Sequence, residues 1–217
     1  MGTIKEKFGY YLLDRHVRRA SRDVVVNNFD TAKTAGVVFN ATHLINFEVV
    51  KKFVDFLQSK SINVTSIGYV HTKKLVDHYL FRKGYDFFTK KDLNWYLKPT
   101  EKSVDDFIHK PFDLLFNLSL ESYYPIQYIV GMSKAKMKVG MFTTEEHYLD
   151  VMIDIEKEKR IRNEVFSEVQ SSQNGKYRHS GEFESEVSFK IQQEIDVDFL
   201  VNQIMHYISI INKAGVY

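Results

Sequence analysis

Five short runs of β-branched, aromatic and aliphatic residues, separated by longer segments, constrain the fold of this chain most strongly. The first run, AGVVFN at 35–40, shows no alternation of polar and apolar residues, which is typical of a strand buried on both faces. The other four runs are NVTSIGYV at 63–70, YDFF at 85–88, FDLLFNLSL at 112–120 and KMKVGMF at 136–142. Parallel strands need long crossover connections, and helical patterns lie between the runs at 44–59, 101–109 and 125–133.

This alternation predicts a Rossmann-like three-layer α/β domain. Right-handed crossovers wind such a chain outward in both directions from its first strand, so we expect a mainly parallel five-stranded sheet with the order 3-2-1-4-5. The C-terminal run VDFLVNQIMHYISIIN has apolar residues at helical spacing and should form the closing helix. A chain of 217 residues is within the size of one domain, which we assign to residues 31–217.

Residues 156–194 predict a β-hairpin insertion in this domain. Apolar and charged residues alternate with a period of two over 160–170 and again over 182–192, as they do in half-buried strands. Asn174-Gly175, a turn-forming pair, lies between the two runs. The alternative is a helix over 155–170, because that stretch is rich in Glu, Lys and Arg.

The hairpin would need a surface to cover its apolar face, since two-stranded ribbons are only marginally stable alone in water. Val187, Phe189 and Ile191 lie on that face in the predicted register. We expect them either to pack on the domain or to bind a protein partner or a second copy of the chain.

Residues 1–30 predict a basic N-terminal helix followed by a linker. Residues 1–23 contain six Lys and Arg against three Asp and Glu, a net charge of +3. The apolar residues at helical spacing are Ile4, Phe8, Tyr11 and Leu12. This apolar stripe either packs on the domain, leaving the arginines solvated, or binds a partner together with them. The candidate partner-binding arginines are Arg15, Arg18, Arg19 and Arg22.

Composition and motifs disfavour several classes of protein. No apolar run approaches the roughly 20 residues that span a bilayer, and the N-terminus lacks a secretory signal pattern, so we expect a cytoplasmic protein. There is no cysteine for a disulfide, a thiolate metal site or a nucleophile. The glycines form neither G-x-G-x-x-G nor G-K-[ST], and the histidines form no H-E-x-x-H. We expect no nucleotide cofactor and no metal, and we favour a protein that is not an enzyme.

Polar side chains follow the first and fourth predicted strands. Ligands of open parallel sheets bind beyond the carboxyl ends of the strands, at the point where the strand order reverses. The side chains expected at that point are Asn40, Thr42, His43, Asn117, Ser119 and Glu121. They predict a small-ligand site, or else they cap the helices that follow, as Asn, Thr and Ser commonly do.

The stretch KKDLNWYLKP at 90–99 contains the only tryptophan, Trp95, among lysines. Aromatic rings among cations stack on nucleic-acid bases or anchor a protein interface. The alternative is an aromatic plug that closes one end of the sheet. Three lysines also alternate along the fifth strand, a pattern that keeps the edge of a sheet soluble: Lys134, Lys136 and Lys138.

Several of these motifs together resemble a family of uncharacterised proteins from Bacteroidota, a domain of unknown function. They are GVVFNAT, FEVVKKFVDFL, IGYV, DFFTKKDLNWYLKP, FDLLFNLSL, MSKAKMKVGMF and IMHYISIIN. The resemblance covers roughly residues 30–155 and 196–213, and it implies no known activity.

A second, shorter resemblance concerns DLLFNLSL and SKAKMKVGMF with the helix between them. This unit is similar to the N-terminal, acceptor-side half of heptosyltransferase-like GT-B glycosyltransferases. Nothing in the chain resembles the second domain of those enzymes, which binds the sugar nucleotide. The resemblance therefore implies at most a degenerate glycosyltransferase-like domain that binds a small ligand.

Three functional hypotheses follow from the sequence. The first is a non-enzymatic cytoplasmic protein that acts through protein contacts as a component of a larger assembly. The second is an RNA- or ribosome-associated protein that binds through its basic N-terminal helix and the lysines around Trp95. The third is a small-ligand enzyme or sensor that uses the polar residues at the strand ends.

Overall fold

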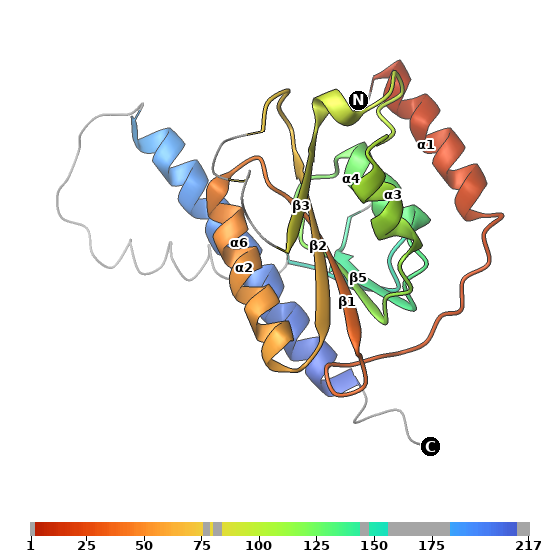
Figure 1. Ribbon diagram of the computed structural model, residues 1–217. Coiled ribbons are helices and arrows are strands. Elements are labelled where there is room, and N and C mark those ends of the chain that lie inside the picture. The colour runs from red at the N-terminus through yellow and green to blue at the C-terminus, as the bar shows by residue number, and fades with distance from the viewer. Residues whose placement is uncertain (1–2, 76–78, 80–83, 144–147, 156–182, 212–217) are drawn as a thin grey trace.

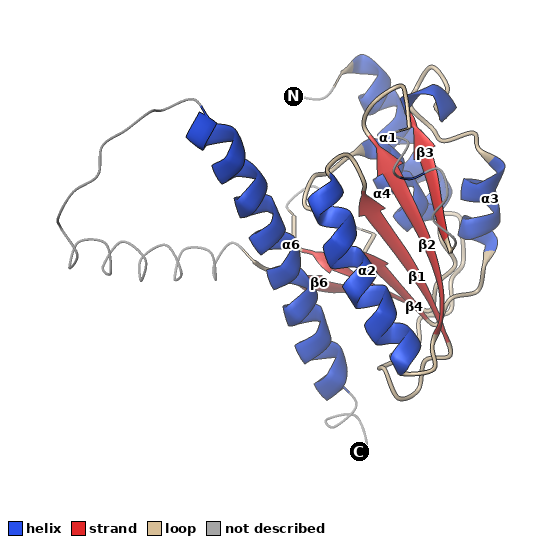
Figure 2. Cartoon of the chain, turned by 60° about the vertical axis from the view of Figure 1, so that its left-hand side comes forward, coloured by secondary structure: helices blue, strands red, loops and turns tan. Residues whose placement is uncertain are grey.

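The computed structural model describes residues 3–75, 79, 84–143, 148–155 and 183–211. Within these residues, six parallel strands form one sheet in the order β3-β2-β1-β4-β5-β6 (Figure 2). The strands are β1 (Thr34–Asn40), β2 (Asn63–Val70), β3 (Tyr85–Thr89), β4 (Leu114–Asn117), β5 (Met137–Met141) and β6 (Val151–Ile153). The predicted order of the first five strands is confirmed, and all five apolar runs contain a strand.

The expectation of five strands is nevertheless wrong by one, because β6 extends the sheet beside β5. This strand has only three residues and is flanked by Asp150 and Asp154, so it is too short for a period of two to show in the sequence. Pairing with β5 fixes it, with Val139 opposite Val151. The fifth strand is therefore not at the edge of the sheet.

Helices cover both faces of the sheet, which gives three layers (Figure 1). One face carries α2 (Leu44–Ser59) and α6 (Phe183–Ile210), and the other carries α3 (Lys102–His109), α4 (Tyr124–Met132) and α1 (Ile4–Val17). Alternate residues of β1 enter the two cores, with Val37 and Phe39 in one and Val38 in the other. No described helix is both long and apolar enough to cross a bilayer.

The predicted hairpin is wrong in its second arm, because residues 183–192 form the start of α6. The first arm lies outside the described residues. The same apolar residues that alternate also recur every four positions, at 183, 187, 191 and 195, and no Gly or Pro occurs between Gly181 and Gly215. The sequence therefore allows one uninterrupted helix from residue 183 onward. The C-terminal half of this helix is the predicted closing helix, and its residues Leu200, Ile204 and Ile208 are fully buried.

The N-terminal helix α1 forms as predicted, but a different face packs on the domain. Its buried residues are Gly9 and Leu13, whereas Ile4 and Tyr11 of the predicted stripe are exposed. The contact is made with α4: a Cβ added at Gly9 would lie 2.6 Å from Cζ of Tyr124, and one added at Gly131 would lie 3.1 Å from Cδ1 of Leu13. The close approach of the two helices, not the number of apolar side chains, sets the orientation of α1.

The linker after α1 is bound to the domain by Arg22. Its guanidinium forms an ion pair with Asp150 and donates a hydrogen bond to the carbonyl oxygen of Ala135 at 2.8 Å. The amide of Val25 also donates to the carbonyl oxygen of Lys136. Arg22, which we predicted to bind a partner, therefore holds the linker along the starts of β5 and β6.

Lys138 is buried instead of solvating an edge, contrary to the pattern of alternating lysines. Its ammonium donates to the carbonyl oxygens of Val130 at 2.7 Å and Gly131 at 3.2 Å, near the C-terminal end of α4. Burial, together with the positive charge of Arg22, lowers the pKa of Lys138 to about 7. This lysine caps the helix on which α1 lies.

Asp113 joins the starts of β1, β4 and β5. Its carboxylate accepts hydrogen bonds from the amides of Lys33 and Thr34 at 2.9 and 3.0 Å, and from the ammonium of Lys136 at 2.9 Å. Burial alone would raise the pKa of Asp113, but these hydrogen bonds outweigh it and lower the pKa from its ordinary value of 3.8 to about 2.

We predict that Asp113→Asn lowers the free energy of unfolding by roughly 1–2 kcal/mol at pH 7, a figure that allows for solvent screening of the half-exposed Lys136. Because the folded-state pKa is depressed, the stabilisation is complete above about pH 4 and is lost as the pH falls towards 2. Urea unfolding of both proteins at a series of pH values measures this. Asp55→Asn, at an exposed position of α2, is the control. A difference that does not depend on pH would contradict the assignment.

Candidate functional site

The outward face of α1 carries the apolar stripe that the sequence left open between packing on the domain and binding a partner. Its apolar side chains are exposed, with Ile4 at 87%, Tyr11 at 62% and Phe8 at 39% of their full accessibility. Side chains at positions 4, 8, 11 and 15 lie on one line along a helix, opposite the buried Gly9 and Leu13. The helix thus turns its apolar line towards solvent.

Trp95 extends this exposed face. Its ring is 62% exposed and stacks on Phe8, with ring centroids 5.1 Å apart and planes at 27°. Tyr96 meets Phe8 edge-on at 5.8 Å. Two segments more than 80 residues apart in the sequence, the N-terminal helix and the aromatic stretch, therefore form one surface.

A constrained loop holds Trp95 in place. The side-chain oxygen of Asn94 accepts hydrogen bonds from the amides of Tyr96 at 3.1 Å and Lys98 at 3.0 Å. Leu97 takes the left-handed backbone conformation, with φ of 68°, and Leu93 pairs with Pro99 across the base of the loop. The exposed tryptophan is thus presented by ordered backbone.

The charges exposed on α1 and in the turn that follows it are all positive. Exposed cations are Lys5, Lys7, Arg15, Arg18 and Arg19. Of the two acidic residues, Glu6 forms a capping box with Thr3 at the start of the helix, and Asp14 accepts a hydrogen bond of 2.6 Å from the hydroxyl of Tyr148. We call Ile4, Phe8, Tyr11, Trp95 and these five cations the α1 surface.

Hydrogen bonds link the predicted ligand residues at the ends of β1 and β4 with those in the loops that follow. His43 stands at the start of α2 and makes no side-chain capping bond there. Asn40 donates to the carboxylate of Glu121 at 2.8 Å and accepts from the amide of Thr42 at 2.9 Å. Asn117 accepts from the amide of Ser119, whose hydroxyl donates to the carbonyl oxygen of Glu121. These polar groups bond to one another and shape the two loops. The alternative that they cap the following helices is wrong, because neither α2 nor α4 has a side-chain cap at its start.

Sequence reasoning missed an aromatic cluster beside these residues. The ring of His71 stacks on Tyr123, with centroids 4.4 Å apart, and its Nδ1 lies 3.1 Å from the hydroxyl of Tyr69. Burial, helped by the positive charge of Lys90, lowers the pKa of His71, while Glu6 opposes the shift. The position of His71 directly after the second apolar run was the signal that could have revealed it.

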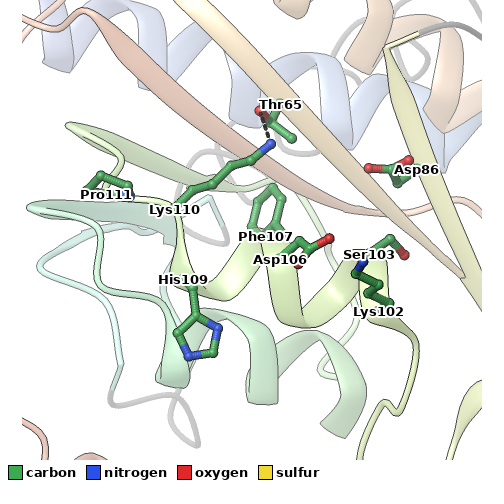
Figure 3. Close-up of a pocket in the computed structure, with 9 residues that line it drawn as sticks. All are labelled: Thr65, Asp86, Lys102, Ser103, Asp106, Phe107, His109, Lys110 and Pro111. Carbon is green, nitrogen blue, oxygen red and sulfur yellow. Dashed lines mark hydrogen bonds between the residues drawn. The ribbon is translucent and has the colours of Figure 1, made fainter.

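A separate groove of about 650 Å³ lies between α3 and strands β2 and β3 (Figure 3). Its lining residues are Thr65, Asp86, Lys102, Ser103, Asp106, Phe107, His109, Lys110 and Pro111. The lining contains both cationic and anionic side chains, and Lys110 donates to the hydroxyl of Thr65 at 3.2 Å. Thr65 and Asp86 lie near the starts of their strands, so the groove is not at the ligand-binding edge of a parallel sheet. Nowhere in the described part of the chain do three His, Asp or Glu residues gather in a metal-binding arrangement.

A family model described as a family of unknown function (DUF6913) matches residues 5–169. The chain belongs to this family. The match begins in α1 and includes every strand of the sheet, so the helix that carries the α1 surface is part of what DUF6913 members share in sequence. No curated protein matches the chain, and no solved structure does.

We predict that Gly9→Ala lowers the free energy of unfolding by about 1–2 kcal/mol, because the added methyl group overlaps the ring of Tyr124 and the carbonyl oxygen of Tyr96. The loss should appear even though Ala is favoured over Gly in a helix by about 1 kcal/mol. Displacement of α1 should also change the fluorescence of Trp95, which stacks on Phe8. Lys7→Ala, at an exposed position of the same helix, should leave both properties nearly unchanged. A stabilised Gly9→Ala protein would contradict the packing of α1 on α4.

Proposed function

We propose that this member of DUF6913 is a non-enzymatic cytoplasmic protein that acts through protein contacts, as a component of a larger assembly. The observation that carries the proposal is the α1 surface, in which Ile4, Tyr11 and Trp95 are exposed side by side with cations. Large apolar and aromatic side chains gathered on one exposed face mark partner surfaces, and Trp, Tyr and Arg are enriched where partners bind most tightly.

The construction of the surface supports a binding role. The helix packs closely on α4 through Gly9, and Asn94 fixes the loop of Trp95, so the exposed side chains stand on an ordered scaffold. Ordered scaffolds lose little conformational entropy on binding. By contrast, the polar residues at the strand ends are bonded to one another, so a ligand there would have to replace existing hydrogen bonds.

Association with RNA or the ribosome is the second candidate. The structure joins the two basic segments that were predicted separately, since Phe8 of the helix stacks on Trp95 of the lysine-rich stretch. Lys90 and Lys91 are exposed in the same stretch. Cations beside exposed aromatic rings are also the arrangement that binds single-stranded nucleic acid.

We predict that the chain, purified with a tag from the cells that make it, elutes as a complex with another protein. Ile4→Glu combined with Tyr11→Glu should release the chain as a monomer, because two carboxylates replace apolar side chains at the interface. Size-exclusion chromatography with mass measurement tests this, and circular dichroism verifies that the variant is folded.

Tyr207→Glu is the matched control, since it places a carboxylate at an exposed tyrosine of α6 on the other side of the sheet. It should leave the complex intact. A wild-type chain that is monomeric, or whose larger mass disappears on ribonuclease treatment, would contradict protein contacts as the function, and the second of these results would favour RNA.

A further inference from the structure

We infer that the partner of the α1 surface is an acidic polypeptide segment that also carries apolar side chains. This inference rests on the proposed function and adds the chemistry of the partner. It follows from the sign of the exposed charges, from their order along the helix and from the shapes of the exposed side chains.

The charge of α1 and the following turn is positive, because five cations outnumber two carboxylates. Glu6 is held in the capping box with Thr3, and Asp14 is held by Tyr148. Five cations remain exposed with no acidic neighbour exposed on the helix. Complementary charge orients a partner and speeds its association, so this face favours a segment rich in Asp and Glu.

The order of the side chains gives the surface two parts. Ile4, Phe8 and Tyr11 occupy the first half of the outward line, and Arg15 continues it towards Arg18 in the following turn. From Ile4 to Arg18 the line is about 21 Å long, which an extended segment of about six residues spans. A fitting segment has an apolar side chain at the Phe8 and Trp95 rings and carboxylates at the arginines.

The aromatic geometry favours a polypeptide over RNA. Phe8 covers one face of Trp95 and Tyr96 meets the Trp95 ring at 76°, so a base could stack on one face of this ring at most and could not be held between two rings. The most exposed apolar residue, Ile4 at 87%, is aliphatic and has no ring on which a base could stack. An apolar side chain of a protein can contact all of these groups.

The same order disfavours a lipid surface. A helix that lies in a membrane interface buries one whole face, with its cations at the flanks. Here Arg15 lies on the same line as Ile4, Phe8 and Tyr11, so flat insertion would carry its guanidinium to the depth of the apolar side chains. Binding of an acidic segment does not require burial of the Arg15 guanidinium among apolar groups, because the segment can place a carboxylate opposite each cation.

The test uses Trp95, the only tryptophan, as the reporter in the full chain. The probe is a twelve-residue peptide in which Glu-Glu-Leu is repeated, and it is compared with one in which Gln replaces Glu. We expect the Glu peptide to shift the emission of Trp95 to shorter wavelength in a saturable way and to bind about tenfold more tightly than the Gln peptide, as three exposed ion pairs would produce. Arg15→Gln with Arg18→Gln and Arg19→Gln should remove that preference.

A charge-matched control removes three exposed lysines elsewhere: Lys52→Gln, Lys60→Gln and Lys102→Gln. It should keep the preference for the Glu peptide. Equal binding of the two peptides would overturn the acidic partner and leave protein contact as the function. Failure of both peptides, with poly(U) RNA or phosphatidylglycerol vesicles shifting or quenching Trp95 instead, would overturn the inference and the proposed function together.

Discussion

The close packing of α1 on α4 at Gly9 determines what this protein presents to solvent. Because Gly9 has no side chain, the helix rests directly against the ring of Tyr124 and the backbone of Tyr96. That contact fixes the rotation of α1 about its axis, so Leu13 is buried and Ile4 and Tyr11 are exposed. The buried Lys138 also stabilises α4, the helix on which α1 packs, because its ammonium donates hydrogen bonds to two carbonyl oxygens at the C-terminal end of α4. The α1 surface is thus a consequence of one helix-helix contact.

Much of the fold could be predicted from the sequence, because buried parallel strands are continuous apolar runs. AGVVFN and FDLLFNLSL were recognisable for this reason, and the handedness of crossovers gave their order. The hairpin expected to include residues 182–192 failed because a short alternating run also fits a helix, and only the absence of Gly and Pro over the following residues separates the two. β6 was too short to leave any periodic pattern.

The site was less predictable, because it depends on contacts between distant segments. Trp95 and the N-terminal arginines could be singled out from composition, but no pattern showed that Phe8 stacks on Trp95 or that Arg22 pairs with Asp150. The apolar stripe of a helix usually faces the core, and of the two alternatives that the sequence left open for α1, packing of Ile4 and Tyr11 on the domain is wrong. A glycine contact has no hydrophobic signal, and this is why Gly9 was overlooked.

The most direct test of this account is the quenching of Trp95 fluorescence in the free chain by iodide and by caesium. An exposed tryptophan on a cationic surface should be quenched strongly by the anion and weakly by the cation, and Arg15→Gln with Arg18→Gln and Arg19→Gln should reduce the difference. Weak quenching by both ions would show that Trp95 is buried. Stronger quenching by caesium would show that the surface is not cationic, and either result would contradict the account.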